Sequence, residues 1–145
     1  MIKSGILNPH ILALLARVRH TNTLVIADRG FPSWPGLETV DISLVDGIPT
    51  VLQVLQAILP NFDCGRIWMA KEFLAENTAE TQSAFRQAAG TIPISFELHE
   101  AFKKRVPGAT GLIRTGDATQ YANLILLSAR AEAERPPEGQ TPEPG

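Results

Sequence analysis

Apolar residues recur at helical spacing in several stretches of the chain, and most of these stretches begin at a residue that favours a helix start. Asn8 followed by Pro9 supplies an N-cap and a first helical position. Thr50 can cap the apolar run that follows it, and Asn77 with Glu80 resembles a capping box. The predicted helices span residues 8–19, 50–58, 77–89 and 99–106.

Short apolar runs between these helices predict β-strands. Residues 23–27, "TLVIA", are typical of a buried strand, and Val40, Ile42 and Leu44 alternate with polar residues as on one face of a second strand. The predicted strands span residues 23–27, 39–44, 66–70, 92–97, 111–115 and 123–128. Strands that alternate with helices predict an α/β fold, a single layered domain with a mixed, largely parallel β-sheet flanked by helices.

The character of the chain changes at Ala129. The segment "ARAEAERPPEGQTPEPG" holds four prolines, four glutamates and no large apolar residue. Such a segment cannot bury enough surface to offset the entropy lost on ordering. We therefore expect a folded domain over residues 1–128 and a flexible tail over residues 129–145.

Composition and charge narrow the classes of partner. The chain has 145 residues, enough for one domain, and a formal charge of -2 that gives no reason to expect nucleic acid or an anionic membrane as partner. No apolar run approaches the roughly 20 residues that span a bilayer. Cys64 is the only cysteine, so no internal disulfide can form, which is typical of a protein in a reducing cytoplasm. Asn8, Pro9 and His10 interrupt any apolar signal-peptide core near the N-terminus. A cytoplasmic protein is expected.

No familiar nucleotide or hydrolase motif is present: there is no glycine-rich fingerprint, no Walker loop and no GxSxG elbow. His20, Asp28 and His99 could form a two-histidine, one-carboxylate metal set, but their spacing matches no familiar metal motif, and we expect no metal. Taken singly, these residues also have structural interpretations. A histidine at an element boundary often hydrogen-bonds a turn, Asp28 could cap its loop, and Tyr121 could simply pack.

His20 and Asp28 are separated by the predicted strand 23–27, which raises a geometric problem. If the segment is extended, eight residues at about 3.3 Å each place them roughly 26 Å apart. Either the chain bends sharply at Thr21 and Asn22, or a neighbouring copy supplies one of the two. A heterologous contact in a closed ring brings one end of a subunit against a different end of its neighbour.

Several segments together resemble one known family. They are "SGILNPHI" at 4–11, "RHTNTLVIADRGFP" at 19–32, "VDISLVDGIPTVLQVL" at 40–55, "LHEAFK" at 98–103 and "IRTGDATQYANLIL" at 113–126. In order and spacing they resemble the D-ribose pyranase family, the RbsD-like sugar mutarotases, over nearly the whole chain up to Leu127. The L-fucose mutarotases are a sister group, and this chain is more similar to the ribose branch.

The resemblance implies an isomerase that interconverts ring forms of a free monosaccharide, ribose pyranose and furanose, without a cofactor. It implies a homo-oligomer, a pentamer or a decamer, with sites at subunit boundaries. It implies that His20 is the proton donor, which suits a side chain with an unperturbed pKa of about 6.5. The residues implied to hold the sugar are Asp28, His99, Tyr121, Ala122 and Asn123.

The chain also departs from the family pattern near the proposed proton donor. Arg19 stands where Gly is usual, Asn22 where Asp is common, and Arg29 where a small residue is usual. Asn22 cannot stabilise an imidazolium as an aspartate does. Two alternatives therefore stay open: an L-fucose-type mutarotase, and a sugar-binding or scaffold protein that keeps the pocket without turnover.

Overall fold

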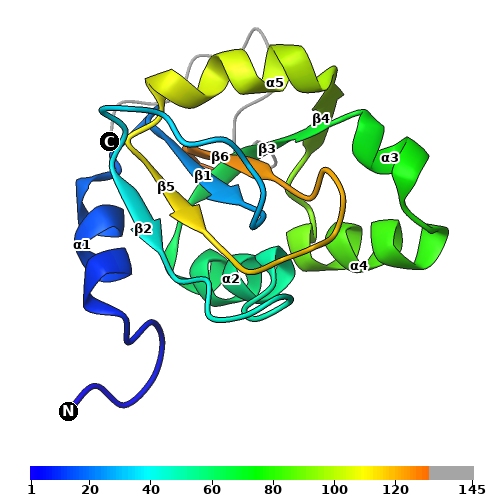
Figure 1. Cartoon of the computed structure of the whole chain (residues 1–145). Helices are drawn as coiled ribbons and strands as arrows, with labels where there is room; N and C mark the ends of the chain where they lie inside the picture. Colours follow the sequence, from blue (N-terminus) through cyan, green and yellow to red (C-terminus); the bar gives the residue numbers. More distant parts are fainter. Residues whose placement is uncertain (131–145) are drawn as a thin grey trace, which may run out of the picture.

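The computed structural model describes residues 1–130 and is built around one mixed β-sheet (Figure 1). Its strands are β1 (Thr23–Ala27), β2 (Thr39–Asp41), β3 (Cys64–Ala70), β4 (Ile94–Glu97), β5 (Gly111–Arg114) and β6 (Leu124–Ser128). They lie in the order β2-β5-β1-β6-β3-β4. β6 is antiparallel to β1 and β3, and the other neighbouring pairs are parallel. The prediction of an α/β fold with a mixed, largely parallel sheet is confirmed.

Helices lie on both faces of the sheet, so the domain has three layers. The helices are α1 (Pro9–Arg17), α2 (Val51–Ile58), α3 (Glu72–Glu76), α4 (Ala79–Ala89) and α5 (His99–Arg105), with 3-10 turns η1 (Leu59–Asn61) and η2 (Val106–Gly108). In Figure 1, α5 runs above the sheet, and α2 and α4 run below it. No helix within residues 1–130 is long and apolar enough to cross a membrane.

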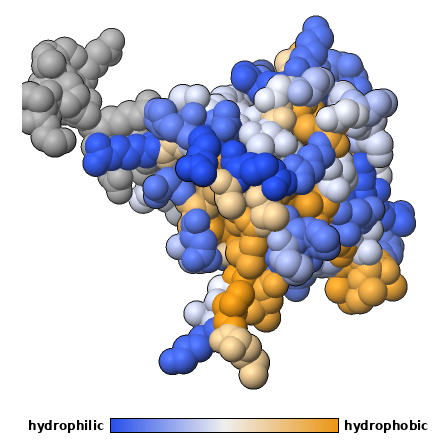
Figure 2. Space-filling model, turned by 90° about the vertical axis from the view of Figure 1, so that its left-hand side faces the viewer, coloured by the Kyte–Doolittle hydropathy of each residue, from blue (hydrophilic) through white to orange (hydrophobic). Residues whose placement is uncertain are grey.

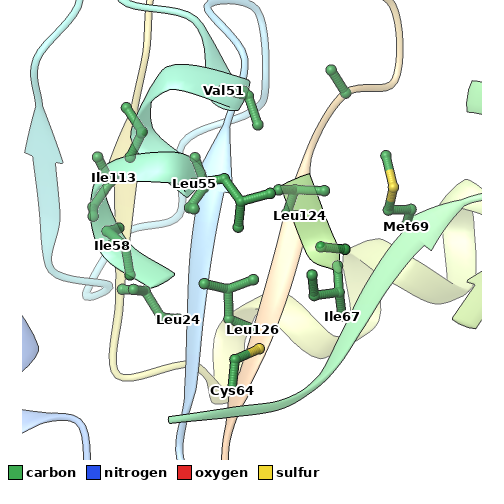
Figure 3. Close-up of a cluster of buried hydrophobic side chains, with 14 of the residues drawn as sticks. Leu24, Val51, Leu55, Ile58, Cys64, Ile67, Met69, Ile113, Leu124 and Leu126 are labelled. Atoms are coloured by element: carbon green, nitrogen blue, oxygen red, sulfur yellow. The ribbon is translucent and has the colours of Figure 1, made fainter. Parts of the chain in front are cut away.

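Strand β1 shows why the sheet is buried on both faces. Leu24 and Ile26 face one core cluster with residues of α1, α2 and α4, while Val25 and Ala27 face a second cluster that includes Phe102 of α5. Because successive side chains of a strand point to opposite faces, a strand covered on both sides must be apolar throughout. Figure 3 shows the larger cluster, in which Leu24 and Leu126 of the sheet lie close to Leu55 and Ile58 of α2.

Two of the predicted helix starts are confirmed. The Asn8 side chain accepts hydrogen bonds from the backbone N–H groups of His10 and Ile11, at 2.9 and 3.0 Å. Thr50 forms a full capping box with Gln53 at the start of α2. Both devices act within four residues, so the local sequence specifies them.

The predicted capping box at Asn77 is wrong. The N-cap of α4 is Thr78, whose side chain accepts from the N–H of Thr81 at 3.2 Å. Asn77 instead donates to the carbonyl of Phe73 in α3 and to that of Gln120, both at 2.9 Å. The Asn77 amide therefore links α3, a helix that the hydrophobic pattern did not predict, to the loop before β6.

The second predicted strand is shorter than expected. β2 ends at Asp41, whose side chain accepts from the backbone N–H of Ser43 at 2.9 Å and turns the chain away from the sheet. Leu44 therefore does not line a strand face: it is 75% exposed. The segment 43–49 forms a loop beside the sheet instead.

The predicted tail, residues 129–145, lies almost wholly outside the described residues. Of its first two residues, Ala129 is buried and donates its N–H to the carbonyl of Asp63 at 3.0 Å. The packed body therefore includes Ala129, one residue beyond the predicted boundary.

Candidate functional site

A pocket of about 320 Å³ opens at the C-terminal end of β1, a strand inside the sheet. Because β6 is antiparallel to β1, the residues before β6 lie at this same end, and α5 begins there after β4. Four predicted site residues meet in this pocket: Asp28, His99, Tyr121 and Asn123. Ala122 is fully buried and does not line it. The remaining lining residues are Gly30, Phe31, Pro32 and Gln120.

The Asp28 carboxylate is held at the start of the loop after β1. It accepts from the backbone N–H of Gly30 at 3.0 Å. Burial raises the pKa of Asp28 above its usual value, hydrogen bonds from Gly30, Asn123 and Phe31 oppose this, and the nearby charge of Asp117 adds to the rise. The result is a carboxylate that takes up a proton more readily than an ordinary aspartate.

Asn123 joins the loop before β6 to the end of β1. It is buried, and its side-chain oxygen accepts the backbone N–H of Asp28 at 2.7 Å. That bond orients the amide so that its NH₂ group serves as the donor toward the Asp28 carboxylate. A carboxylate and an amide side by side are well suited to bind neighbouring hydroxyl groups.

The imidazole of His99 is packed among aromatic rings. Its ring centroid lies 5.1 Å from that of Tyr121 in an edge-on arrangement and 6.1 Å from those of Phe31 and Phe102. Its Nδ1 atom is buried and has no hydrogen-bond partner among the described residues. The backbone N–H of His99 donates to both carboxylate oxygens of Glu72, at 3.0 and 3.1 Å. The ring is therefore fixed in place at the wall of the pocket.

Tyr121 reaches the pocket through an unusual backbone conformation. Its φ is +56°, in the left-handed region that residues other than glycine rarely adopt. The carbonyl of the preceding Gln120 is held by the Asn77 side chain at 2.9 Å. Backbone strain of this kind persists where the surroundings hold it, and it is frequent at binding sites.

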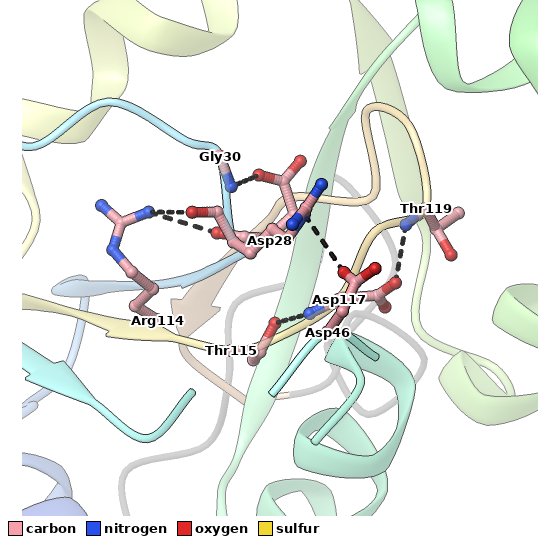
Figure 4. Close-up of polar contacts among 8 residues, drawn as sticks. Asp28, Gly30, Asp46, Arg114, Thr115, Asp117 and Thr119 are labelled. Atoms are coloured by element: carbon pink, nitrogen blue, oxygen red, sulfur yellow. Dashed lines mark hydrogen bonds and ion pairs between the residues drawn. The ribbon is translucent and has the colours of Figure 1, made fainter. Parts of the chain in front are cut away.

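Behind the pocket lies a polar segment that the sequence reasoning missed, residues 114–117 (Figure 4). The buried carboxylate of Asp117 accepts from the N–H groups of Val51 and Thr119, at 2.9 and 2.8 Å. The Thr115 hydroxyl donates to the carbonyl of Ala27 at 2.8 Å. Arg114 is also buried. The available signal was that charged residues directly follow the apolar strand "GLI".

His20 lies at the opposite end of β1 and does not line the pocket. The bend considered from the sequence is present, since Thr21 has a φ of +70° and donates its N–H to Ser128 at 2.7 Å. The bend leaves His20 exposed at the far edge, a strand length of about 17 Å from the pocket. Asn22 stabilises this turn by accepting the N–H of Arg19 at 2.9 Å.

The structure also places the possible metal set, Arg29 and Cys64. Because His20 lies apart from Asp28 and His99, these three do not form a metal set in one chain, and no group of three or more His, Cys, Asp or Glu within residues 1–130 could hold a metal ion. Arg29 is exposed and pairs with Asp46 at 3.2 Å. Cys64 is a packed thiol, and burial raises its pKa to about 11, which makes it a poor nucleophile.

Comparison with known proteins gives consistent matches. The model of the RbsD / FucU transport protein family matches residues 1–129. Over 128 residues the chain is 44% identical to the D-ribose pyranase of Chromobacterium violaceum, covering 88% of this chain and 97% of the relative. It is 42% identical over 128 residues to the D-ribose pyranase of Geobacillus kaustophilus, covering 88% and 93%.

Two solved structures are similar to this one. The structure of Bacillus subtilis RbsD complexed with D-ribose matches with a TM-score of 0.83 and 34% identity, covering 89% of this chain and 98% of that one. The fucose mutarotase from Streptococcus pneumoniae in complex with L-fucose matches with a TM-score of 0.71 and 23% identity, covering 84% and 92%. At that identity the second match shows a shared fold alone.

Proposed function

This chain belongs to the RbsD / FucU transport protein family, and from that membership we propose that it is a sugar mutarotase, an isomerase that interconverts ring forms of a free monosaccharide. The proposed substrate is D-ribose, converted between pyranose and furanose. This choice is supported by the relatives named D-ribose pyranase at 44% and 42% identity. Among the solved structures, the identity is 34% to RbsD complexed with D-ribose and 23% to the fucose mutarotase.

The observation that carries the proposal is the composition of the pocket. A carboxylate, an amide, an imidazole and a phenol converge in about 320 Å³ from Asp28, Asn123, His99 and Tyr121. This volume is at the lower end of the range for small-molecule sites, as a single sugar unit requires. The carboxylate and amide can hydrogen-bond hydroxyl groups, while the aromatic rings offer apolar faces to the C–H groups of the sugar.

The proposed chemistry is acid–base catalysis. Ring opening delivers a proton to the ring oxygen and removes one from the anomeric hydroxyl, and closure through a different hydroxyl reverses both transfers. No electrons leave the sugar, so the reaction calls for no cofactor. In this proposal His20 is the proton donor, and Asp28, His99 and the segment 121–123 hold the sugar.

The position of His20 leads to a shared site in a homo-oligomer. Within one chain, His20 lies at the opposite end of β1 from the pocket. The proposal therefore places the His20 of a neighbouring copy at the pocket, in a ring that forms a pentamer or a decamer. Exposed apolar side chains support association: Leu44, Val45 and Ile48 are 75%, 57% and 52% exposed. Figure 2 shows apolar surface gathered on the lower half of one face.

The test is saturation-transfer NMR on D-ribose with and without the protein. The expected result is faster exchange between pyranose and furanose signals at catalytic protein concentration. Parallel measurements on L-fucose and other free sugars identify the preferred substrate, and faster exchange of fucose than of ribose would favour the L-fucose-type alternative.

A second candidate is a sugar-binding protein without turnover, favoured by the absence of His20 from the pocket of its own chain. The same experiment separates the two functions. A binder perturbs the ribose signals in a titration but leaves the exchange rate between ring forms at its value in buffer.

A further inference from the structure

A buried arginine lies directly behind the pocket and takes no part in lining it. Arg114 is the last residue of β5 and is only 9% exposed. A guanidinium removed from water needs hydrogen-bond acceptors to replace its hydration, and a carboxylate partner is the usual solution. The charge of Asp41, its neighbour on β2, acts on Arg114, but the hydrogen-bond acceptors of Arg114 are of a different kind.

The Arg114 guanidinium spreads its hydrogen bonds over one loop. Nη1 donates to the carbonyls of Asp28 at 3.2 Å and Arg29 at 3.4 Å. Nη2 donates to the carbonyl of Pro32 at 3.3 Å and to the hydroxyl of Ser33 at 3.4 Å. All four acceptors are neutral, and they belong to the two ends of the segment 28–33. Figure 4 shows the guanidinium beside the part of this loop that carries Asp28 and Gly30.

This loop forms half of the candidate sugar pocket. Asp28, Gly30, Phe31 and Pro32 are four of its eight lining residues. The loop has no regular secondary structure. Near its start, Asp28 and Arg29 donate their N–H groups to Asn123 and Asp117, at 2.7 and 3.0 Å, and Gly30 donates to the Asp28 carboxylate. In its middle, the buried Phe31 ring packs against Trp34, His99 and Phe102. The Arg114 guanidinium bridges the beginning of the loop and its end.

We propose that Arg114 is a positioning residue of the sugar site, which holds the loop 28–33 so that the Asp28 carboxylate and the Phe31 ring face the pocket. The inference rests on the proposed function for its sugar-binding readout. Arg114 acts on the position of the loop and not on the charge of Asp28, because the hydrogen bonds that lower the pKa of Asp28 come from Gly30, Asn123 and Phe31. A planar fork is required to reach two pairs of acceptors at once, and a lysine ammonium does not provide one.

The experiment compares Arg114→Lys, Arg114→Ala and the control Arg105→Lys. The Arg105 guanidinium is also forked, bonded twice to Glu97 and stacked over Trp68, but it is exposed, its bonds lie outside the loop 28–33 and it does not line the pocket. Three properties are measured: ribose affinity by NMR titration, melting temperature, and hydrogen exchange of the Arg29 and Gly30 amides in the free protein. Free guanidinium is then added to Arg114→Ala, with urea as the reference additive.

The expected result is a folded Arg114→Lys protein whose ribose affinity falls about tenfold or more, as losing hydrogen bonds from a charged group implies. Its Arg29 and Gly30 amides exchange faster, while Arg105→Lys changes neither property. Guanidinium, and not urea, restores part of the affinity of Arg114→Ala. Wild-type affinity and amide exchange in Arg114→Lys would overturn the proposal. Unfolding of both Arg114 variants would also overturn it, because Arg114 would then act on global stability. If the wild-type protein binds no sugar, the proposed function fails, and the amide exchange still decides whether Arg114 holds the loop.

Discussion

At the scale of single residues, Asp28 carries a charge that the proposed sugar site needs, in surroundings that disfavour this charge. Burial raises its pKa above the usual value of 3.8, so the folded protein binds this proton more tightly than the unfolded chain does. As the pH rises from 3.8 through the raised value, ionisation of Asp28 therefore reduces the stability of the folded state. Asp41 has the opposite sign, because hydrogen bonds from Ser43 lower its pKa.

We expect Asp28→Asn to abolish ribose binding at pH 7 while leaving the melting temperature close to that of the wild type. The amide oxygen can still accept the Gly30 N–H, and the side chain carries no charge to bury, which offsets the acceptor lost to Asn123 and Phe31. Calorimetry at pH 4 and pH 7 and a ribose titration measure the two effects. Asp41→Asn is the control and should lose stability at pH 7, as a lowered pKa requires. A large drop in the melting temperature of Asp28→Asn at pH 7 would contradict the assignment.

His20 is the second residue whose role can be tested alone. Because it is exposed and at the far end of β1, His20→Ala should leave the melting temperature unchanged. Losing a positioned acid or base should slow the exchange of ribose ring forms by about 10²- to 10⁴-fold. The measurement is saturation transfer, and His10→Ala, another exposed histidine, is the matched control. Wild-type exchange rates in folded His20→Ala would remove this residue from the mechanism.

At the scale of elements, the loop 43–49 and the segment 114–117 are joined through Gly116. Its N–H donates to the carbonyl of Pro49 at 2.9 Å, and its carbonyl accepts the N–H of Gly47. A Cβ atom here would lie 2.5 Å from the carbonyl oxygen of Ile48 and closer still to that of Val45. Only glycine allows the loop 43–49 to approach the segment 114–117 this closely.

Gly116→Ala should therefore displace backbone and not merely side chains. We expect a loss of about 1–3 kcal/mol in the free energy of unfolding, as for overpacked interiors, with weaker ribose binding because Asp117 and the loop before β6 move too. Denaturant titration measures the first effect. Gly108→Ala is the control, since a Cβ at Gly108 meets nothing within 4 Å. Equal stability of the two variants would show that the loop adapts without cost.

At the scale of the whole molecule, the proposed proton donor, His20, and the proposed sugar pocket lie at opposite ends of strand β1. Strand β1 connects them and is buried on both faces, so it cannot shorten or fold to bring them together. If both serve one reaction, two copies must supply them.

Mixing His20→Ala with Tyr121→Ala tests this sharing. Each variant alone should be inactive, whereas dissociation and reassembly of the mixture should restore part of the activity, because some interfaces inherit both intact halves. Light scattering reports the size of the assembly, and each variant reassembled with itself is the control. An active monomer, or no recovery on mixing, would mean that the site is not shared.

The boundary of the folded body gives a further prediction. Truncation after Arg130 should leave the melting temperature and the ribose exchange rate unchanged, because the removed residues carry no large apolar side chain. Truncation after Ser128 is the comparison. It also removes Ala129, which is buried and hydrogen-bonded to Asp63, and should cost stability. A drop of several degrees after the first truncation would mean that residues 131–145 contribute to the stability of the body.

The local sequence by itself determined the elements whose signals lie within a few residues. The apolar run 23–27 gives β1 with its observed bounds, and Thr50 with Gln53 starts α2, because burial pattern and capping bonds depend on near neighbours. The segments that resemble a family also indicated Asp28, His99, Tyr121 and Asn123, which the fold brings into one pocket. Where a side chain has distant partners, the local pattern misled: Asn77 looked like a cap and instead bonds Gln120.

Only the tertiary structure decided how these pieces form a site. β6 runs antiparallel between β1 and β3, which places Asn123 beside Asp28 across 95 residues of chain, and no pattern within either segment encodes that direction. The contacts of Arg114 and the bond between Asp117 and Val51 were hidden for the same reason, since these partners lie far away in the sequence. Hydrogen bonds between distant segments depend on strand order and register. Strand order and register are set by the packing of the whole sheet and its helices. The separation of His20 from the pocket could be expected from the length of β1. The contacts of Asn123 and Arg114 with Asp28 could not.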